Sequence, residues 1–288
     1  MSCEKLKQSY RQNNKMSYGQ WLQSAYKSLQ NVNIPSARLD AELLLGFSIK
    51  KPRHYIIAHS EDQLSTAQLQ RLKKLLKRRI DREPIAYILG YKEFYGRNFM
   101  VSPSVLIPRP ESETIIKLFK QHNLTGRVLD VGTGSGCIGL TLKAEHPAIN
   151  LTISDVSTSA LEVARKNAKK LGIKPIRCIQ SDLLEHWLLH KNPKKFDVII
   201  ANLPYVDSSW QVSPETAFEP AGALFSKESG MQHIKRLFVQ TPQLLQRNGH
   251  LLIEADPRQH NKLSKYAEKS GLQPIKKEDF IVLYTYLG

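Results

Sequence analysis

Cysteine is scarce in this sequence, and its three cysteines, Cys3, Cys137 and Cys178, lie far apart. They are odd in number and fit no CxxC or Cys/His spacing, so we expect neither a disulfide framework nor a metal site. Long apolar runs are also missing: no stretch of about 18 apolar residues could form a transmembrane helix. The first fifteen residues lack the apolar segment of a signal peptide, so we expect a cytoplasmic protein with no membrane association.

Acidic residues are outnumbered, with 26 Asp and Glu against 42 Lys and Arg and a formal net charge of +16. Residues 1–90 hold 16 of the basic residues against 7 acidic ones. Within residues 71–82, leucine and isoleucine recur at helical spacing between basic side chains, which predicts a helix with one buried apolar face. Its basic face is either solvated or docks a partner. This charge permits a nucleic-acid contact without requiring one.

The chain is long enough for two unequal domains, and the composition and spacing of its apolar residues change twice along the sequence. Residues 1–84 show helical spacing, with Ser36 and Ser65 as expected N-caps, and predict a helical bundle. Residues 85–108 are rich in aromatic and β-branched side chains punctuated by glycine, which predicts a β-hairpin linker. Residues 109–288 alternate apolar runs with helical segments and predict an α/β domain.

The apolar runs of the third region are continuous rather than alternating, as expected for strands covered by helices on both faces. They predict a doubly wound, mostly parallel sheet, in which ligands bind beyond the carboxyl ends of the strands. The expected strands are residues 127–131, 150–154, 176–180, 196–201 and 250–255.

A glycine-rich loop follows the first of these strands, in LDVGTGSGCIG. Glycines at 132, 134 and 136 allow a tight turn and close approach of the backbone to a ligand at the start of a helix. Residues 134–139 also fit the dinucleotide pattern GxGxxG. Asp155, at the end of the second strand, is placed to accept hydrogen bonds from two ribose hydroxyls. Both NAD and S-adenosylmethionine carry such a ribose, so the loop and the acid leave the cofactor open.

A second motif, Asn202-Leu203-Pro204-Tyr205, ends the strand at residues 196–201. The Asn202 side-chain oxygen can accept a hydrogen bond, and Pro204 forces residue 203 into an extended conformation that turns its carbonyl outward. Two convergent acceptors suit the two hydrogens of an NH₂ group, and Tyr205 offers a face for a planar group. Held in this way, a planar nitrogen can localise its lone pair toward an electrophilic methyl group. The motif therefore predicts amino-group or amide methylation by positioning and electrostatics.

The glycine loop, the acid and this tetrad resemble amino-group methyltransferases that use S-adenosylmethionine. Three further stretches, REPIAYILGYKEFYG (82–96), VLIPRPESE (105–113) and FEPAGAL (218–224), are similar to the peptide-chain release factor glutamine N5-methyltransferases, the HemK/PrmC family. The resemblance implies a Rossmann-like class I methyltransferase with a seven-stranded sheet. It also implies methyl transfer to the glutamine amide of the Gly-Gly-Gln motif in class 1 release factors, which the N-terminal helical domain helps to dock. We expect a monomer.

The resemblance also assigns residues. It implies that Asp182 and Leu183 lie near the adenine and that Asn202 lies beside the methyl group. The tetrad Asn202, Leu203, Pro204 and Tyr205 is expected to bind the substrate amide and to act in catalysis. The remaining cofactor-binding residues implied by the resemblance are Gly132, Thr133, Gly134, Ser135, Gly136 and Asp155.

Two positions depart from the family pattern. The family tetrad is usually NPPY, and here Leu203 replaces the first proline; because its role belongs to its carbonyl, we expect leucine to be tolerated. IEAD, at 253–256, has Asp256 where the family tends to have glycine.

Three alternatives compete with this interpretation. NLPY also resembles the tetrad of the ribosomal-RNA adenine dimethylases, so N6-adenine methylation of RNA or DNA is the main alternative. An NAD-dependent oxidoreductase would leave the tetrad unexplained. A binding module without catalysis would leave all three motifs unexplained.

Overall fold

The computed structural model describes residues 16–173 and 176–288. Cys3 lies outside these residues, and Cys137 and Cys178 are free thiols. The chain divides into two compact units, with the division between Leu89 and Gly90. No helix in the described part of the chain is long and apolar enough to cross a membrane.

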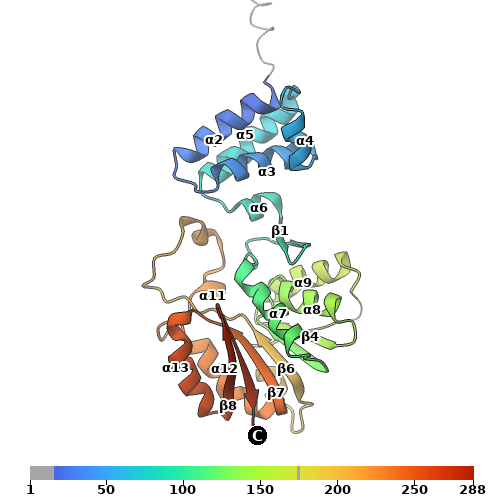
Figure 1. Cartoon of the computed structure of the whole chain (residues 1–288), viewed down its shortest axis with the longest axis vertical. Helices are drawn as coiled ribbons and strands as arrows, with labels where there is room; N and C mark the ends of the chain where they lie inside the picture. Colours follow the sequence, from blue (N-terminus) through green and yellow to red (C-terminus); the bar gives the residue numbers. More distant parts are fainter. Residues whose placement is uncertain (1–15, 174–175) are drawn as a thin grey trace, which may run out of the picture. The chain divides into compact units, whose positions relative to one another are not determined.

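The first unit is helical, as the spacing of its apolar residues predicts (Figure 1). Ser65 caps the helix that begins at Thr66 through a reciprocal capping box with Gln68. Ser36 is the N-cap residue of the helix that begins at Ala37, as predicted, but its side chain makes no capping hydrogen bond. Asp40 accepts a hydrogen bond from Arg79 at 2.6 Å inside the bundle. The helices are α2 (Tyr18–Gln30), α3 (Ala37–Ile49), α4 (Arg53–Ala58), α5 (Thr66–Ile80) and α6 (Ile85–Leu89).

Helix α5 has the two faces that the sequence predicts. Leu72 and Leu75 are buried in the core of the unit. The side chains of Arg71, Lys73 and Lys74 are exposed. The helix therefore presents a row of cations to its surroundings, and its apolar face packs against the core of the bundle.

Residues 85–108 differ from the predicted linker at their start. Ile85–Leu89 is not a strand but the short helix α6, whose last four residues are buried. The hairpin follows as β1 (Tyr91–Phe94) and β2 (Arg97–Met100), paired in antiparallel register. Tyr95 and Gly96 both have positive φ angles, as a two-residue turn between twisted strands requires.

The second unit contains the predicted seven-stranded sheet, in the order β5-β4-β3-β6-β7-β9-β8. Strands β3 to β7 are parallel, and β9 is antiparallel to both of its neighbours. The fold class is thereby confirmed. The strands are β3 (Arg127–Val131), β4 (Asn150–Asp155), β5 (Arg177–Gln180), β6 (Phe196–Ala201), β7 (Leu245–Glu254), β8 (Leu272–Glu278) and β9 (Ile281–Tyr286).

Helices cover both faces of this sheet, and successive residues of a strand enter opposite cores (Figure 1). In β6, Val198 and Ile200 pack on the side of α7, α8 and α9, whereas Ile199 and Ala201 pack on the side of α12 and α13. The longer helices are α7 (Glu113–Gln121), α8 (Cys137–Glu145), α9 (Thr158–Lys170), α12 (Gln232–Leu244) and α13 (Pro257–Glu268). The short ones are η1 (Pro110–Ser112), α10 (Glu185–Leu188), η2 (Pro214–Phe218) and α11 (Ala221–Leu224).

The strand order fixes where a ligand can bind. From β3 the chain moves to β4 on one side, and β6 later pairs with β3 on the other. This change of direction opens a crevice beyond the carboxyl end of β3, where open α/β sheets hold their ligands.

Candidate active site

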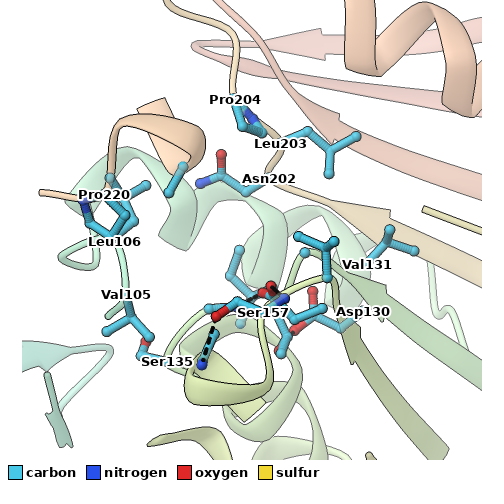
Figure 2. Close-up of a pocket in the computed structure, with 18 of the residues that line it drawn as sticks. Val105, Leu106, Asp130, Val131, Ser135, Ser157, Asn202, Leu203, Pro204 and Pro220 are labelled. Atoms are coloured by element: carbon cyan, nitrogen blue, oxygen red, sulfur yellow. Dashed lines mark hydrogen bonds between the residues drawn. The ribbon is translucent and has the colours of Figure 1, made fainter. Parts of the chain in front are cut away.

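A cavity of about 280 Å³ lies at this crevice, and it gathers most of the residues that the sequence singled out. Figure 2 shows Asn202 and Leu203 above the loop that carries Ser135, with Leu106 and Pro220 to one side. Gly136 is not among the lining residues, although it was predicted to bind the cofactor. The predicted residues that do line the cavity are Gly132, Thr133, Gly134, Ser135, Asp155, Asp182, Leu183, Asn202, Leu203 and Pro204.

Gly136 has a structural reason for its glycine. Its φ angle is +81°, and it is the N-cap of α8. A Cβ at this position would lie 2.8 Å from Leu140 Cδ1 and 3.3 Å from Ala164 Cβ. A larger residue would therefore be strained by its backbone and would push α8 away from α9.

Asp130 holds the glycine loop from below. Its side chain is buried, and Oδ2 accepts hydrogen bonds from Thr133 Oγ1 at 2.6 Å and from the Gly139 backbone N–H at 3.1 Å. Burial raises the pKa of Asp130 to about 6, against the lowering effect of these two bonds. Asp130 also lines the cavity, but the sequence motifs did not single it out, because it precedes the glycines.

Asp155 lies at the end of β4 and is 9% exposed. Its Oδ2 accepts a hydrogen bond from the Gly134 N–H, and its Oδ1 accepts one from the Ser157 N–H, both at 2.9 Å. Burial raises its pKa, while these backbone bonds lower it. Each carboxylate oxygen has a second lone pair, so the side chain can accept further hydrogen bonds from a ligand in the cavity.

Asp182 and Leu183 line the same cavity from the segment after β5. Asp182 accepts a hydrogen bond from Arg236 at 2.9 Å, and Leu183 is buried with a positive φ angle. His233, from α12, also lines this part, and burial lowers its pKa, which favours the neutral ring. His233 has no motif of its own and was not predicted.

The tetrad lies where the cavity meets a second one. Asn202 Nδ2 donates a hydrogen bond to Ser112 Oγ at 3.1 Å. The Leu203 side chain is buried and belongs to the core on the α12 side of the sheet. Its Cδ2 lies 3.0 Å from where a Cβ on Gly132 would stand, so leucine packs directly under the glycine loop.

The second cavity, of about 220 Å³, shares Asn202, Leu203 and Arg109 with the first and adds Tyr205 and Glu254 to its lining. The Tyr205 hydroxyl donates a hydrogen bond to Glu254 Oε1 at 3.1 Å. Burial, and next the charge of Glu254, raise the pKa of Tyr205, which stays a phenol. Two ligands, one in each cavity, would thus meet at Asn202.

Glu219 joins two sequence motifs into one wall. Its side chain, 2% exposed, accepts a hydrogen bond from the Ile107 N–H at 3.0 Å and one from Arg109 at 2.5 Å. Ile107 and Arg109 belong to VLIPRPESE, and Glu219 to FEPAGAL. The two segments line the first cavity together, a contact across more than 100 residues that no local pattern indicates.

No cluster of three or more His, Cys, Asp or Glu side chains that could hold a metal ion occurs among residues 16–173 and 176–288. The chemistry that the described site itself offers is hydrogen bonding, aromatic contact and the charge of its buried carboxylates.

Comparisons with known proteins agree with this architecture. Residues 20–90 match the family model of the PrmC N-terminal domain, and residues 110–219 match that of the methyltransferase small domain. A solved structure, the T. thermophilus 16S rRNA N2 G1207 methyltransferase in complex with AdoMet and guanosine, is 16% identical with a TM-score of 0.51. That match covers 69% of this chain and 50% of that one, and it bears on the fold alone.

Curated relatives are more similar in sequence. The release factor glutamine methyltransferase of Koribacter versatilis is 41% identical over 253 residues, 84% of this chain and 89% of that protein. The Salmonella typhimurium release factor glutamine methyltransferase is 36% identical over 265 residues, 91% of this chain and 94% of that protein. This identity extends over both units, and we conclude that the chain belongs to the release factor glutamine methyltransferase family.

Proposed function

We propose that this protein methylates the side-chain amide nitrogen, N5, of the glutamine in the Gly-Gly-Gln motif of class 1 peptide-chain release factors. As a member of its family it is a methyltransferase that uses S-adenosylmethionine. The observation that supports the proposal best is the meeting of two cavities at Asn202 and Leu203. One cavity carries the glycine loop and the acid, and the other has the aromatic ring of the tetrad.

The first cavity suits S-adenosylmethionine by its chemistry. Asp155 retains lone pairs for the ribose hydroxyls, and the glycine loop brings backbone close to the ligand. We assign the adenine end to Asp182 and Leu183, where His233 also lines the wall. When bound, S-adenosylmethionine supplies an electrophilic methyl group. The residues of the protein bind and orient the reactants and exclude water.

The tetrad holds the amide that is to be methylated. The Asn202 Nδ2 group is engaged by Ser112, so its Oδ1 is the atom left to accept a hydrogen from the substrate NH₂. We assign the second hydrogen to the Leu203 carbonyl, turned outward by Pro204. The planar amide then rests against Tyr205, and its nitrogen lone pair is directed at the methyl group. Hydrogen bonds of this kind strengthen as positive charge develops on nitrogen.

The helical unit is the proposed docking element. Within the proposed division, residues 1–84 bind the release factor, residues 85–108 link, and residues 109–288 carry out the reaction. The cations on α5 offer a surface for an acidic partner, and a nucleic-acid contact would use the same charges. We infer that the protein acts as a monomer in the cytoplasm, where its substrate works in translation.

Purified protein, labelled S-adenosylmethionine and an isolated class 1 release factor test the reaction. Label should enter the release factor and should be lost when the glutamine of its Gly-Gly-Gln motif is replaced by alanine. Label entering RNA, with none in the factor, would instead indicate the adenine methylation that the tetrad also permits.

A truncated chain tests the docking role. Removal of residues 1–82 should leave the affinity for S-adenosylmethionine unchanged and abolish methylation of the intact factor. Equal activity of the truncated and full-length chains on the intact factor would mean that the basic face of α5 is merely solvated.

A further inference from the structure

We propose that Glu254 is a positioning residue that acts through Ser112 to fix which end of the Asn202 amide faces the reactants. The inference rests on the proposed function, since it specifies how the Asn202 oxygen comes to face the substrate. Glu254 touches neither the proposed substrate nitrogen nor the methyl group. Its role is to set the direction of a short chain of hydrogen bonds.

Glu254 is the last residue of β7 and is 1% exposed. Its Oε2 accepts a hydrogen bond from Ser112 Oγ at 2.5 Å, and Ser112 Oγ accepts one from Asn202 Nδ2 at 3.1 Å. The three groups come from β7, from η1 and from the end of β6, and the two bonds span 142 and 90 residues of sequence. Such a chain of contacts exists only in the folded protein.

The chemistry of the first group decides the direction of the others. An ionised carboxylate has lone pairs and no hydrogen, so Ser112 must donate its single hydroxyl hydrogen to Glu254. Ser112 then has only lone pairs left and must accept from Asn202. The amide of Asn202 consequently turns its NH₂ group to Ser112, which leaves Oδ1 for the cavity.

The reverse orientation would oppose the reaction. An Asn202 amide turned by 180° would present its NH₂ group to the NH₂ group of the substrate, and two donors would face each other. Because the two orientations of an amide have nearly the same shape, packing alone does not select between them. A group that can only accept is required beside Ser112, and Glu254 is such a group in its ionised form.

The same carboxylate also holds the aromatic member of the tetrad. Its Oε1 accepts the hydrogen bond from the Tyr205 hydroxyl. Within the described ranges no Lys or Arg is paired with Glu254, so the charge is not neutralised by an ion pair. A buried carboxylate without a counter-ion costs stability, and burial raises its pKa to about 7. The ionised form, which sets the direction of the hydrogen bonds, is therefore the major form above that pH. A group that only filled space here would be apolar, and this cost is consistent with a functional role.

The variant Glu254→Gln tests the inference, because glutamine keeps the size of the side chain and adds a donor. Ser112 can then accept a hydrogen bond from the introduced amide in place of donating one to a carboxylate, and Asn202 is free to turn. With an isolated release factor as substrate, we expect kcat to fall at least about tenfold. The Kd for S-adenosylmethionine should stay within about twofold, since Glu254 does not line the first cavity. An unchanged kcat would overturn the inference.

A double-mutant cycle separates positioning from a general loss of structure. If Glu254 acts through Asn202, adding Glu254→Gln to Asn202→Ala should lower kcat by less than about twofold beyond Asn202→Ala alone. An equal loss in both backgrounds would overturn the inference. Thr241→Val is the matched control, because Thr241 is a fully buried polar residue of α12 whose hydroxyl bonds only the Leu237 carbonyl in the described structure. It should leave kcat unchanged.

A measurement without turnover distinguishes failure of this inference from failure of the proposed function. The side-chain NH₂ resonances of Asn202 should shift in NMR spectra of Glu254→Gln and of Ser112→Ala, and should stay in place in Thr241→Val. Unshifted resonances in Glu254→Gln would overturn the inference. A wild-type chain that fails to methylate release factors would contradict the proposed function and leave this result standing.

Discussion

Leu203 offers a test of the tetrad in which stability and turnover should separate. Leu203→Pro restores the proline usual in the family and keeps the carbonyl direction that Pro204 enforces. Leu203 is 5% exposed and packs in the core under Gly132. A proline ring has one carbon fewer than a leucine side chain, worth about 0.8 kcal/mol of burial, and fills the site with a different shape. Full truncation of a buried leucine costs about 2 to 5 kcal/mol, which sets the upper limit. We expect a loss of about 1 to 3 kcal/mol in the free energy of unfolding.

Turnover of the folded variant should stay within a few-fold of the wild type, because only the backbone of residue 203 acts on the substrate. Asn202→Ala should behave in the opposite way. It removes an acceptor that strengthens in the transition state, which typically costs about 2.7 to 4 kcal/mol, or at least a hundredfold in kcat. Urea denaturation gives the stabilities, and steady-state assays on an isolated release factor give kcat and KM. A collapse of kcat in folded Leu203→Pro, or normal turnover by Asn202→Ala, would refute this account of the tetrad.

Three further outcomes follow from the buried carboxylates. Asp155→Ala removes the proposed ribose acceptor and should weaken S-adenosylmethionine binding at least about tenfold by calorimetry; unchanged affinity would contradict the assignment. Glu219→Gln should lower the melting temperature and weaken cofactor binding, because it loosens the wall formed with Ile107; a variant as stable and as tight as the wild type would count against that wall. The pKa of Asp130 rises from its ordinary 3.8 to about 6 on folding, so folding takes up a proton and stability should fall as pH rises from about 4 to about 6. Asp130→Asn should reduce that slope in denaturation curves, where Glu254, with its own pKa raised to about 7, still contributes. An identical slope would show that Asp130 does not cause it.

The central strands could be read from the sequence because burial on both faces leaves an unbroken apolar run. RVLDV and FDVIIA match β3 and β6 at both ends. Strands β8 and β9 were not located, although β9 is an apolar and mostly buried strand. β8 lies at the edge of the sheet. Its sequence LQPIKKE is largely exposed, and its register shifts after Pro274. Such a strand is defined by its partner rather than by its own residues.

At helix α6 the sequence predicted a strand where the structure has a helix. Its sequence IAYIL has the β-branched and aromatic residues typical of strands, which is why the pattern predicts part of the hairpin there. In the folded unit, Ile88 joins the core of the helical bundle. Tertiary packing of so short a segment outweighs its local preference, which no pattern within five residues reveals.

The site divides in the same way between local and distant contacts. The loop, Asp155 and the tetrad each lie at the carboxyl end of a strand. Because ligands of parallel sheets bind at these ends, the sequence alone predicted that these residues lie close together. The bonds of Ser112 with Glu254 and of Ile107 with Glu219 join segments more than 100 residues apart. In the sequence, most of these residues belonged to stretches that resemble a family, and no local pattern indicated which contacts they make.

Asp256, which stands where the family tends to have glycine, is explained by the helix that follows it. Asp256 is the N-cap of α13, and its side chain accepts a hydrogen bond from the Arg258 N–H at 2.9 Å. Glycine is also tolerated at an N-cap, so the family's usual residue and aspartate suit the same position. Gln259 completes the capping box by accepting from the Asp256 N–H, a bond that any residue at 256 except proline can donate. Because this bond fixes the direction of the Gln259 amide, the Gln259 NH₂ group donates to the Tyr205 carbonyl at 2.8 Å. The link from α13 to the tetrad thus depends on the backbone of residue 256, and the aspartate alters the helix end without altering the site.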